Sequence, residues 1–270
     1  MNIGIVGLGL IGGSMAKAVK ARTRHTVFGA NRSPATLQAA MLAGAVDRVL
    51  DERTLPLCDF VVISTYPAAA IEYIKANLDR FKPDSIVVDC SGVKRAICGP
   101  LHEVVRGRDF TFIGGHPMAG NEHSGFGASD AHLYDRAVML LTPYDETPIP
   151  VRQRARDFFL ETGFKRVHFT APDVHDREIA YTSQLPHIIS NAYAKSPTSD
   201  GCEDFAAGSY RDLTRVAKLN APMWAELFLE NADNLTRELD GLAGRLRAYS
   251  DAIKAGDQAA LEAVMREEIK

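Results

Sequence analysis

The stretch "NIGIVGLGLIGGS", residues 2–14, decides the fold of the N-terminal part of the chain. A short apolar run ends at Gly7 and a helix-like stretch begins at Leu10, so three glycines lie in a strand–turn–helix context. In this pattern the first glycine permits a tight turn, the second lets the backbone approach a pyrophosphate, and the third allows close helix–sheet packing. The stretch therefore predicts a dinucleotide-binding turn formed by Gly7, Leu8, Gly9, Leu10, Ile11 and Gly12.

Apolar runs alternate with amphipathic stretches through the first 168 residues. The runs are continuously hydrophobic, which is typical of strands in a sheet that is covered on both faces. The alternation predicts an α/β fold with a Rossmann-type, doubly wound and mainly parallel sheet. We expect strands over residues 2–7, 25–30, 60–65, 85–90, 110–115 and 137–142, and helices over residues 10–22, 33–43, 67–78 and 94–105.

The chain from residue 169 onward has the pattern of helices. Residues 170–173 and the start of residues 220–256 both supply a capping residue followed by a proline, and the second stretch keeps apolar residues at helical spacing. We predict a dinucleotide-binding domain over residues 1–168 and an all-helical substrate-binding and dimerisation domain over residues 169–270. Because so few helices cannot bury their apolar stripes alone, the pattern also predicts a homodimer.

Composition limits the classes of partner. The 270 residues carry a net charge of -3, which gives no general attraction to nucleic acid or to membrane surfaces. No basic leader or long apolar segment follows Met1, so we expect a cytoplasmic protein that acts on a small molecule. The four cysteines show no C-x-x-C spacing and are expected to be reduced, and the sequence indicates no metal site.

The cofactor prediction rests on the end of the second strand. An NAD site usually carries Asp or Glu there, because a carboxylate accepts hydrogen bonds from the ribose hydroxyls and repels a 2′-phosphate. Here the strand leads into Asn31, Arg32 and Ser33, which suit a phosphate and favour NADP over NAD. The alternative is that Arg32 stacks on the adenine or faces solvent while NAD binds. Further cofactor contacts are expected at the ends of the next strands, from Ser64, Thr65, Ser91 and Gly92.

A candidate base follows the fifth apolar run. In "GGHPMAG", residues 114–120, the glycines would let a loop approach a ligand closely and Pro117 would stiffen it. Ligands of a doubly wound sheet bind outside the carboxyl ends of its strands, so His116 is expected near the nicotinamide. There it could take a proton from a hydroxyl while hydride leaves the same carbon. The alternative is a structural histidine.

The helical part supplies a second polar cluster. Ser183 and His187 are four residues apart, and so are Arg211 and Arg215, with Asp212 beside them. Residues at this spacing share one face of a helix. Two guanidinium groups near a histidine suggest recognition of carboxylates, whereas the alternative for each is a surface salt bridge.

Several motifs occur in one order along the chain: "GLGLIGGS", "GVK" (residues 92–94), "GGHPMAGNEHSG", "HD" (residues 175–176), "SQLPH", "YRDLTR" and "MW" (residues 223–224). In this order they resemble the prephenate/arogenate dehydrogenase family of tyrosine biosynthesis, from Gly7 to about Asn231. The resemblance implies an oxidative decarboxylation, in which hydride leaves C4 of the prephenate ring for NAD(P), the C4 hydroxyl loses its proton, and loss of CO2 gives 4-hydroxyphenylpyruvate. Arogenate, which yields tyrosine, is the alternative substrate.

The resemblance also implies roles for residues. His116 would be the base, Arg215 would hold a substrate carboxylate, and Ser183 and His187 would contact substrate or cofactor. An ionic network that steers Arg215 and closes the site would comprise Glu122, His175 and Asp212. Trp224 would lie at the substrate pocket and could belong to a second subunit, unless it is an ordinary core residue.

The chain departs from the family pattern at two positions. Many relatives have "SVK", with a serine that hydrogen-bonds the catalytic histidine, where this chain has Gly92; Ser91 is the candidate replacement. Many also have "SHLPH", where this chain has Gln184 in place of the first histidine. A competing class, the β-hydroxyacid dehydrogenases, would use a lysine such as Lys195 or Lys218. A binding-only relative would be expected to have lost His116 or Arg215, and both are present.

Overall fold

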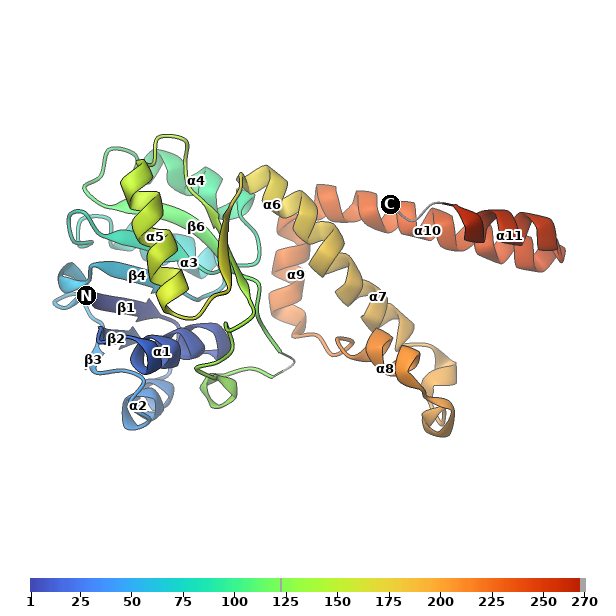
Figure 1. The fold of residues 1–270 in the computed structure, drawn as a ribbon, viewed down its shortest axis with the longest axis horizontal. Coiled ribbons are helices and arrows are strands. Elements are labelled where there is room, and N and C mark those ends of the chain that lie inside the picture. The colour runs from blue at the N-terminus through green and yellow to red at the C-terminus, as the bar shows by residue number, and fades with distance from the viewer. Residues whose placement is uncertain (122, 268–270) are drawn as a thin grey trace. The chain divides into compact units, whose positions relative to one another are not determined.

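The computed structural model describes residues 1–121 and 123–267 (Figure 1). The chain forms two compact units, and each is described by itself. The first unit comprises residues 1–176 together with residues 221–227, which return to it from later in the chain. The second unit comprises residues 177–220 and those from 228 onward.

The first unit is built on a sheet of eight strands in the order β3-β2-β1-β4-β5-β6-β7-β8. Neighbouring strands are parallel from β3 to β6, β7 is antiparallel to β6, and β8 is parallel to β7. The expected doubly wound, mainly parallel sheet is thereby confirmed. The strands are β1 (Asn2–Val6), β2 (Thr26–Ala30), β3 (Arg48–Val49), β4 (Phe60–Ile63), β5 (Ile86–Asp89), β6 (Thr111–Pro117), β7 (Val138–Thr142) and β8 (Arg166–Phe169).

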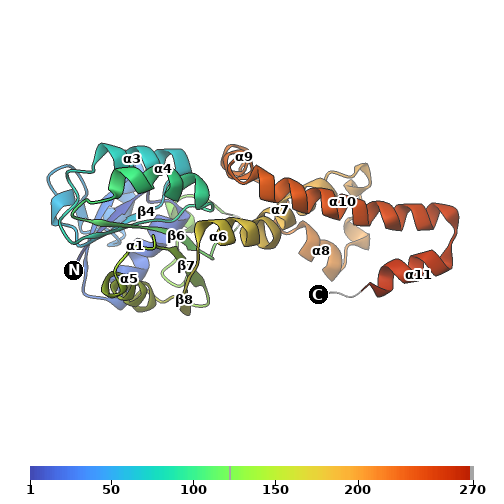
Figure 2. The same ribbon diagram turned by 90° about the horizontal axis from the view of Figure 1, so that it is seen from above.

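Helices cover both faces of this sheet, because successive side chains of a strand point to opposite faces and here both are apolar. On one face, Phe60 and Val62 of β4 share a core with α1 (Leu10–Arg22), α2 (Pro34–Leu42) and α5 (Ile149–Glu161). On the other face, Val61 and Ile63 share a core with α3 (Pro67–Ala76) and α4 (Arg95–Val105). Figure 2 shows α3 and α4 on one side of the sheet and α5 on the other.

The six expected strands and four expected helices of this unit are confirmed, and three further elements appear. β3 is only two exposed residues long, and β8 is mostly exposed at the sheet edge, so neither produces an apolar run. Helix α5 carries two exposed arginines, Arg154 and Arg156, among its apolar residues, which masks its apolar stripe. Short 3-10 turns complete the connections of this unit at η1 (Leu55–Leu57) and η2 (Phe126–Ala128), and the second unit contains two more, η4 (Pro197–Ser199) and η5 (Glu203–Phe205).

The C-terminal part is helical, as expected. Helix α6 (Pro172–Ile179) runs through a single π-helical turn, η3 (Ala180–Gln184), into α7 (Leu185–Tyr193). The helical stretch expected over residues 220–256 is divided at Asn231 into α9 (Ala221–Glu230) and α10 (Ala232–Ala255). Within the second unit α10 packs on η3 and α7, and α7 also contacts α8 (Gly208–Thr214), while α11 (Gln258–Arg266) contacts α10. Of the helices described, none combines the length and apolarity needed to cross a membrane.

Candidate active site

Close contacts in the turn after β1 explain why two of its positions are glycine. Gly7 has φ +86°, and a Cβ there would lie 2.6 Å from the Ser64 carbonyl oxygen, while a Cβ at Gly12 would lie 1.8 Å from the Gly7 oxygen. These two glycines are therefore required by the fold. Gly9, at the N-cap of α1, is different, because apart from its neighbours along the chain no described atom lies within 4 Å of where its Cβ would be. Its backbone thus offers a helix N-terminus that a phosphate could approach.

The three residues predicted to contact the adenosine ribose make different contacts in the structure. They are Asn31, Arg32 and Ser33. The Asn31 side-chain oxygen accepts a hydrogen bond from the Leu8 amide at 2.9 Å, which joins the end of β2 to the glycine turn. The Ser33 hydroxyl caps α2 by accepting from the Thr36 amide at 3.3 Å. Arg32 is exposed and carries the only positive charge of the three. Any recognition of a 2′-phosphate at this strand end therefore depends mainly on Arg32.

Hydroxyl groups gather at the ends of β4 and β5. The Thr65 hydroxyl oxygen is buried and has no hydrogen-bond partner among the described residues, and that of Ser64 has only the neighbouring Cys90 thiol. Because buried polar groups normally have partners, these hydroxyls fit a polar ligand. Together with the open backbone of Gly9, they fit a nicotinamide dinucleotide.

His116 lies on strand β6, and not on the stiffened glycine loop that the sequence predicted. β6 pairs with β5 over residues 111–113 and with β7 over residues 114–117, where His116 is opposite Leu140. A Cβ at Gly114 would lie 2.3 Å from the Thr142 hydroxyl oxygen, and one at Gly115 would lie 2.5 Å from the Asp89 carbonyl oxygen. These two glycines are thus needed for packing inside the sheet, not for approach to a ligand.

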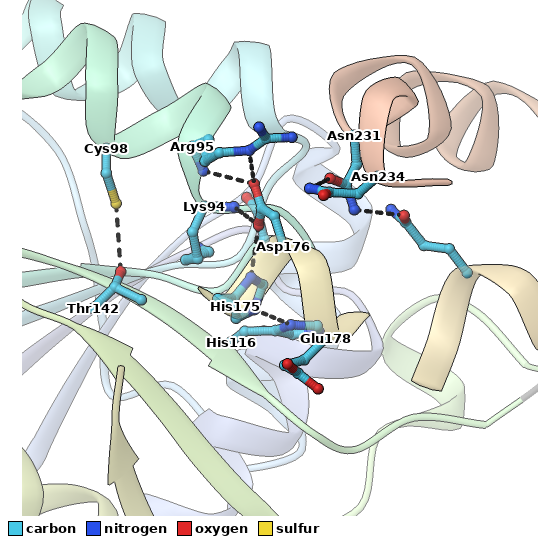
Figure 3. Close-up of polar contacts among 12 residues, drawn as sticks. Lys94, Arg95, Cys98, His116, Thr142, His175, Asp176, Glu178, Asn231 and Asn234 are labelled. Carbon is cyan, nitrogen blue, oxygen red and sulfur yellow. Dashed lines mark hydrogen bonds and ion pairs between the residues drawn. The ribbon is translucent and has the colours of Figure 1, made fainter. Parts of the chain in front are cut away.

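A chain of hydrogen bonds leads from His116 to a buried carboxylate (Figure 3). His116 Nδ1 lies 2.9 Å from His175 Nε2, and His175 Nδ1 lies 2.7 Å from Asp176 Oδ1. The two Asp176 oxygens accept from the backbone amides of Lys94 and Arg95 at 2.8 and 2.9 Å. Helix α6 supplies His175 and Asp176, and the start of α4 supplies the two amides, so the group joins three elements of the first unit.

A buried ion pair between Lys94 and Asp89 adjoins this series of hydrogen bonds. Lys94 Nζ is 2.5 Å from Asp89 Oδ2 and donates to the Gly115 carbonyl oxygen at 2.5 Å, and both charged side chains are 0% exposed. The other Asp89 oxygen accepts from the Gly115 amide at 3.1 Å. The pair thus fixes the backbone immediately before His116. Sequence reasoning assigned no role to Asp89, Lys94 or Asp176; the available signals were a charged residue ending an apolar strand and the "HD" pair itself.

The electrostatics of the chain favour a neutral histidine facing a charged aspartate. Burial lowers the pKa of His116 well below its ordinary value, and the neighbouring His175 and Lys94 lower it further. Burial opposes ionisation of Asp176, yet the hydrogen bonds from His175 and the Arg95 and Lys94 amides hold the pKa of Asp176 below its usual value. A neutral imidazole can accept a proton, so the arrangement suits a general base.

Gly92 lies beside the other nitrogen of His116. A Cβ at Gly92 would lie 3.9 Å from His116 Nε2 and 3.4 Å from the Leu227 methyl groups. The expected replacement of the missing serine by Ser91 is wrong, because the Ser91 hydroxyl donates to the Thr65 carbonyl oxygen at 3.4 Å. Trp224 is half-buried on α9, one turn before Leu227, within the segment that belongs to the first unit of its own chain.

In the second unit the structure brings His187, Ser183 and Arg215 into one neighbourhood. His187 Nδ1 donates to the Ser183 carbonyl oxygen at 2.7 Å. Burial lowers the pKa of His187, the bond to Ser183 opposes this, and the positive charge of Arg215 adds to the lowering. Arg211, Asp212 and Arg215 are exposed and form no ion pair within the described residues, so the salt-bridge alternative is not realised there.

The ionic network that the resemblance implied is not assembled in this form. His175 is bonded to His116 and Asp176 instead, Asp212 and Arg215 are not paired with each other, and Glu122 lies outside the described residues. Gln184, at the family's histidine position, is 1% exposed, and its oxygen accepts from Asn231 Nδ2 at 2.8 Å. Asn234 Nδ2 donates in turn to Asn231 Oδ1 at 2.9 Å (Figure 3). Gln184 therefore takes part in a buried series of amide hydrogen bonds.

Comparison with known protein families agrees with these features. The family model for the prephenate dehydrogenase nucleotide-binding domain matches residues 15–168, and the model for the prephenate dehydrogenase dimerization domain matches residues 171–267. The chain belongs to the prephenate dehydrogenase family. It is thus an NAD(P)-dependent oxidoreductase of a family that serves tyrosine biosynthesis, and membership sets the β-hydroxyacid alternative aside.

Individual relatives of this family cover nearly the whole chain. A cyclohexadienyl dehydrogenase of Zymomonas mobilis is 31% identical over 95% of this chain and 89% of its own length. The structure of Aquifex aeolicus prephenate dehydrogenase with hydroxyphenyl propionate and NAD+ has a TM-score of 0.86 at 27% identity, covering 99% of this chain and 95% of that one. Synechocystis arogenate dehydrogenase has a TM-score of 0.81 at 27% identity, covering 99% and 97%.

Proposed function

We propose that the protein is a prephenate dehydrogenase, which converts prephenate to 4-hydroxyphenylpyruvate and CO2. The observation that supports this most is the hydrogen-bonded His116, whose neutral ring has one nitrogen engaged by His175 and the other beside Gly92. NAD(P) supplies the hydride acceptor when bound. His116 takes the proton of the ring hydroxyl as that carbon is oxidised, and the bond between the ring and its carboxylate breaks so that its electron pair makes the ring aromatic.

Arg215 holds a carboxylate of the substrate in this proposal. Its guanidinium is exposed and has no ion pair within the described residues, and a fork of donors matches a carboxylate in two hydrogen bonds. Arg211 and Asp212 adjoin it, and Ser183 and His187 supply further polar contacts. Trp224 and Leu227 lie on one face of α9, and Leu227 borders Gly92, so Trp224 is assigned to the apolar wall of the substrate pocket.

Arogenate remains the alternative substrate, since relatives include both a cyclohexadienyl and an arogenate dehydrogenase. Initial rates of nicotinamide reduction, measured with prephenate and arogenate and with NAD and NADP, test the proposal. We expect the largest kcat/KM with prephenate. A larger value with arogenate would replace the substrate assignment, and absence of activity in all four combinations would reject the proposed reaction.

We further propose that NADP is preferred over NAD, with Arg32 as the residue responsible. A charge-assisted hydrogen bond contributes about 1.5 kcal/mol or more, so the Arg32→Ala substitution should raise the KM for NADP about tenfold and leave that for NAD nearly unchanged. Arg53→Ala, at another exposed arginine of the same unit, is the matched control. Equal effects of Arg32→Ala on both cofactors would refute this role.

The domain assignment and the dimer also belong to the proposal. Residues 1–168 would bind the cofactor, and residues 169–270 would bind substrate and join two chains. The second unit leaves large apolar side chains exposed, among them Phe205 at 88%, Leu229 at 76% and Ile253 at 63%. A second copy of the helical unit would cover such surface. Light scattering should give twice the mass of one chain, and a monomeric mass would contradict the dimer. We place the enzyme in the cytoplasm, where NAD(P) and its substrate are available.

A further inference from the structure

We propose that His175 and Asp176 are positioning residues that hold His116 as its Nδ1–H tautomer, so that Nε2 is the atom that accepts the proton. The inference rests on the proposed function of His116 as the base. It assigns the orientation of that base to a buried pair on α6 and derives from the hydrogen-bond chain of the first unit alone (Figure 3).

The first step fixes the proton on His175. Asp176 accepts from the Lys94 amide, from the Arg95 amide, and from Arg95 Nε at 3.3 Å. A carboxyl group surrounded by donors is an ionised acceptor, with no proton of its own to give. His175 Nδ1, at 2.7 Å from Asp176 Oδ1, must therefore carry the hydrogen of that bond.

The second step determines which of the two rings, His175 or His116, donates the hydrogen bond between them. His175 is 2% exposed, and burial lowers its pKa although Asp176 opposes the effect, so its ring is neutral. A neutral imidazole with hydrogen on Nδ1 has a lone pair on Nε2. The 2.9 Å contact between His175 Nε2 and His116 Nδ1 then requires His116 to be the donor. The reverse order would place the lone pair of His175 Nδ1 against the charged carboxylate.

The third step concerns the nitrogen that remains. His116 Nε2 keeps its lone pair and lies 3.9 Å from where a Gly92 Cβ would be. Gly92 carries no hydroxyl that could orient the ring from this side, and the Ser91 hydroxyl is directed to Thr65. Among the described residues the ring of His116 is therefore oriented through Nδ1, and its basic atom is left beside a residue without a side chain.

The Lys94–Asp89 pair holds the His116–His175–Asp176 series of hydrogen bonds in place. Both charges are fully buried and hold the Gly115 backbone, and the Lys94 amide itself donates to Asp176. The same residue thus positions both ends of the chain, the strand that carries His116 and the carboxylate that orients it. Lys94 and His175 are the charged or titratable neighbours that act on His116.

The test compares His175→Leu and His175→Gln with a control pair of variants. The histidine tautomers are measured by NMR on protein that contains histidine labelled with nitrogen-15. The ring signals of His116 are assigned by their loss in His116→Ala. We expect the Nδ1–H tautomer in the unchanged protein and the Nε2–H tautomer in His175→Leu, with kcat reduced about a hundredfold and the KM for prephenate within twofold. In His175→Gln the charged Asp176 recruits the amide NH2, which leaves the amide oxygen to accept from His116, so much of kcat should return.

His102 provides the matched control. It is a partly exposed histidine on α4 whose Nε2 lies 2.7 Å from a carboxylate oxygen of Glu146, away from the chain described above. His102→Leu and His102→Gln should leave both the tautomer and kcat unchanged. Retention of the Nδ1–H tautomer in His175→Leu, or equal losses of kcat in the leucine and glutamine variants with the tautomer intact, would overturn the inference.

The spectrum separates this inference from the proposed reaction. It is recorded on the protein without substrate, so a tautomer change in His175→Leu supports the positioning role even if the protein acts on neither prephenate nor arogenate. Conversely, activity on prephenate with an Nε2–H tautomer in the unchanged protein would uphold the reaction and reject the positioning role. Cofactor binding, measured by fluorescence, and circular dichroism confirm that each variant is folded.

Discussion

The candidate catalytic groups of the first unit and the candidate carboxylate-binding groups of the second differ in how far the protein itself satisfies them. In the first unit His116, His175, Asp176, Lys94 and Asp89 form a continuous, mostly buried set of hydrogen bonds. In the second unit Arg211, Asp212 and Arg215 are exposed and have no ion pairs within the described residues. Proton transfer needs a fixed geometry, which the fold can supply in advance. Recognition of a carboxylate needs positive charge that the protein has not already neutralised.

The strongest test of this contrast is removal of the base. His116→Ala deletes the proton acceptor but none of the glycine turn, so kcat should fall about 10²- to 10⁴-fold while cofactor affinity stays within twofold. Steady-state rates and fluorescence titration with NAD(P) measure the two quantities. An unchanged kcat would remove His116 from the chemistry and leave the buried set with a purely structural role.

The stability of the buried set is tested at Lys94. Lys94→Met leaves the Asp89 carboxylate buried without its partner, which should lower the free energy of unfolding by about 3–5 kcal/mol. Lys20→Met is the matched control, because Lys20 pairs with Asp47 at 2.8 Å on the surface, where such a pair contributes about 0–1 kcal/mol. Denaturant titration gives both values. Similar losses in the two variants would mean that burial does not distinguish these pairs.

The proposed role of Arg215 in the second unit is tested with two substitutions. One removes its charge, and the other keeps the charge but changes the geometry of its donors. Arg215→Ala should raise the KM for substrate about 10- to 100-fold, as expected for loss of charge-assisted hydrogen bonds of about 1.5–3 kcal/mol, with little change in kcat. Arg215→Lys keeps the charge but loses the fork and should give an intermediate KM. Arg156→Ala, on the surface of α5, is the control. Wild-type KM in Arg215→Ala would assign the carboxylate to another residue.

Acidification should affect stability through the buried histidines. The pKa values of His116, His175 and His187 are all lowered in the folded state, with burial as the largest cause. The unfolded chain therefore binds more protons below pH of about 6.5, and stability rises with pH up to that value. We expect a lower unfolding midpoint at pH 5.5 than at pH 7.5, with each unit of pKa shift contributing about 1.4 kcal/mol. The difference should shrink in His175→Gln, and an unchanged difference would contradict this origin.

The sequence predicted the elements that are buried on both sides and missed those that are not. β1, β4 and β5 are continuous apolar runs, whereas β3 and β8 are exposed at the edges of the sheet and resemble loops. The glycine turn was predicted together with its mechanism, and Gly7 and Gly12 have the close contacts that the pattern requires. Such local patterns depend on neighbouring residues, which the sequence shows directly.

The sequence predicted some residues of the candidate site, but not the hydrogen bonds that connect them. His116 was identified as a candidate base, yet its bond to His175 spans 59 positions and depends on how α6 meets β6. Lys94 begins a helix in the sequence and resembles a surface residue, and only the fold reveals its burial beside Asp89. Gln184 was noted as a departure, but its amide contact with Asn231 required the break between α9 and α10. Contacts between distant segments are fixed by tertiary packing.

The return of residues 221–227 to the first unit has a consequence for synthesis of the protein. Glu226 Oε1 accepts from the Ala68 amide at the start of α3 at 3.0 Å, and Leu227 covers Gly92. A nascent chain that has left the ribosome only as far as Asp176 has all eight strands but lacks both of these contacts. The nucleotide-binding unit is therefore completed late in translation, after about half of the helical unit, residues 177–220, has been made. A truncated chain that is meant to retain the surroundings of His116 would have to include α9.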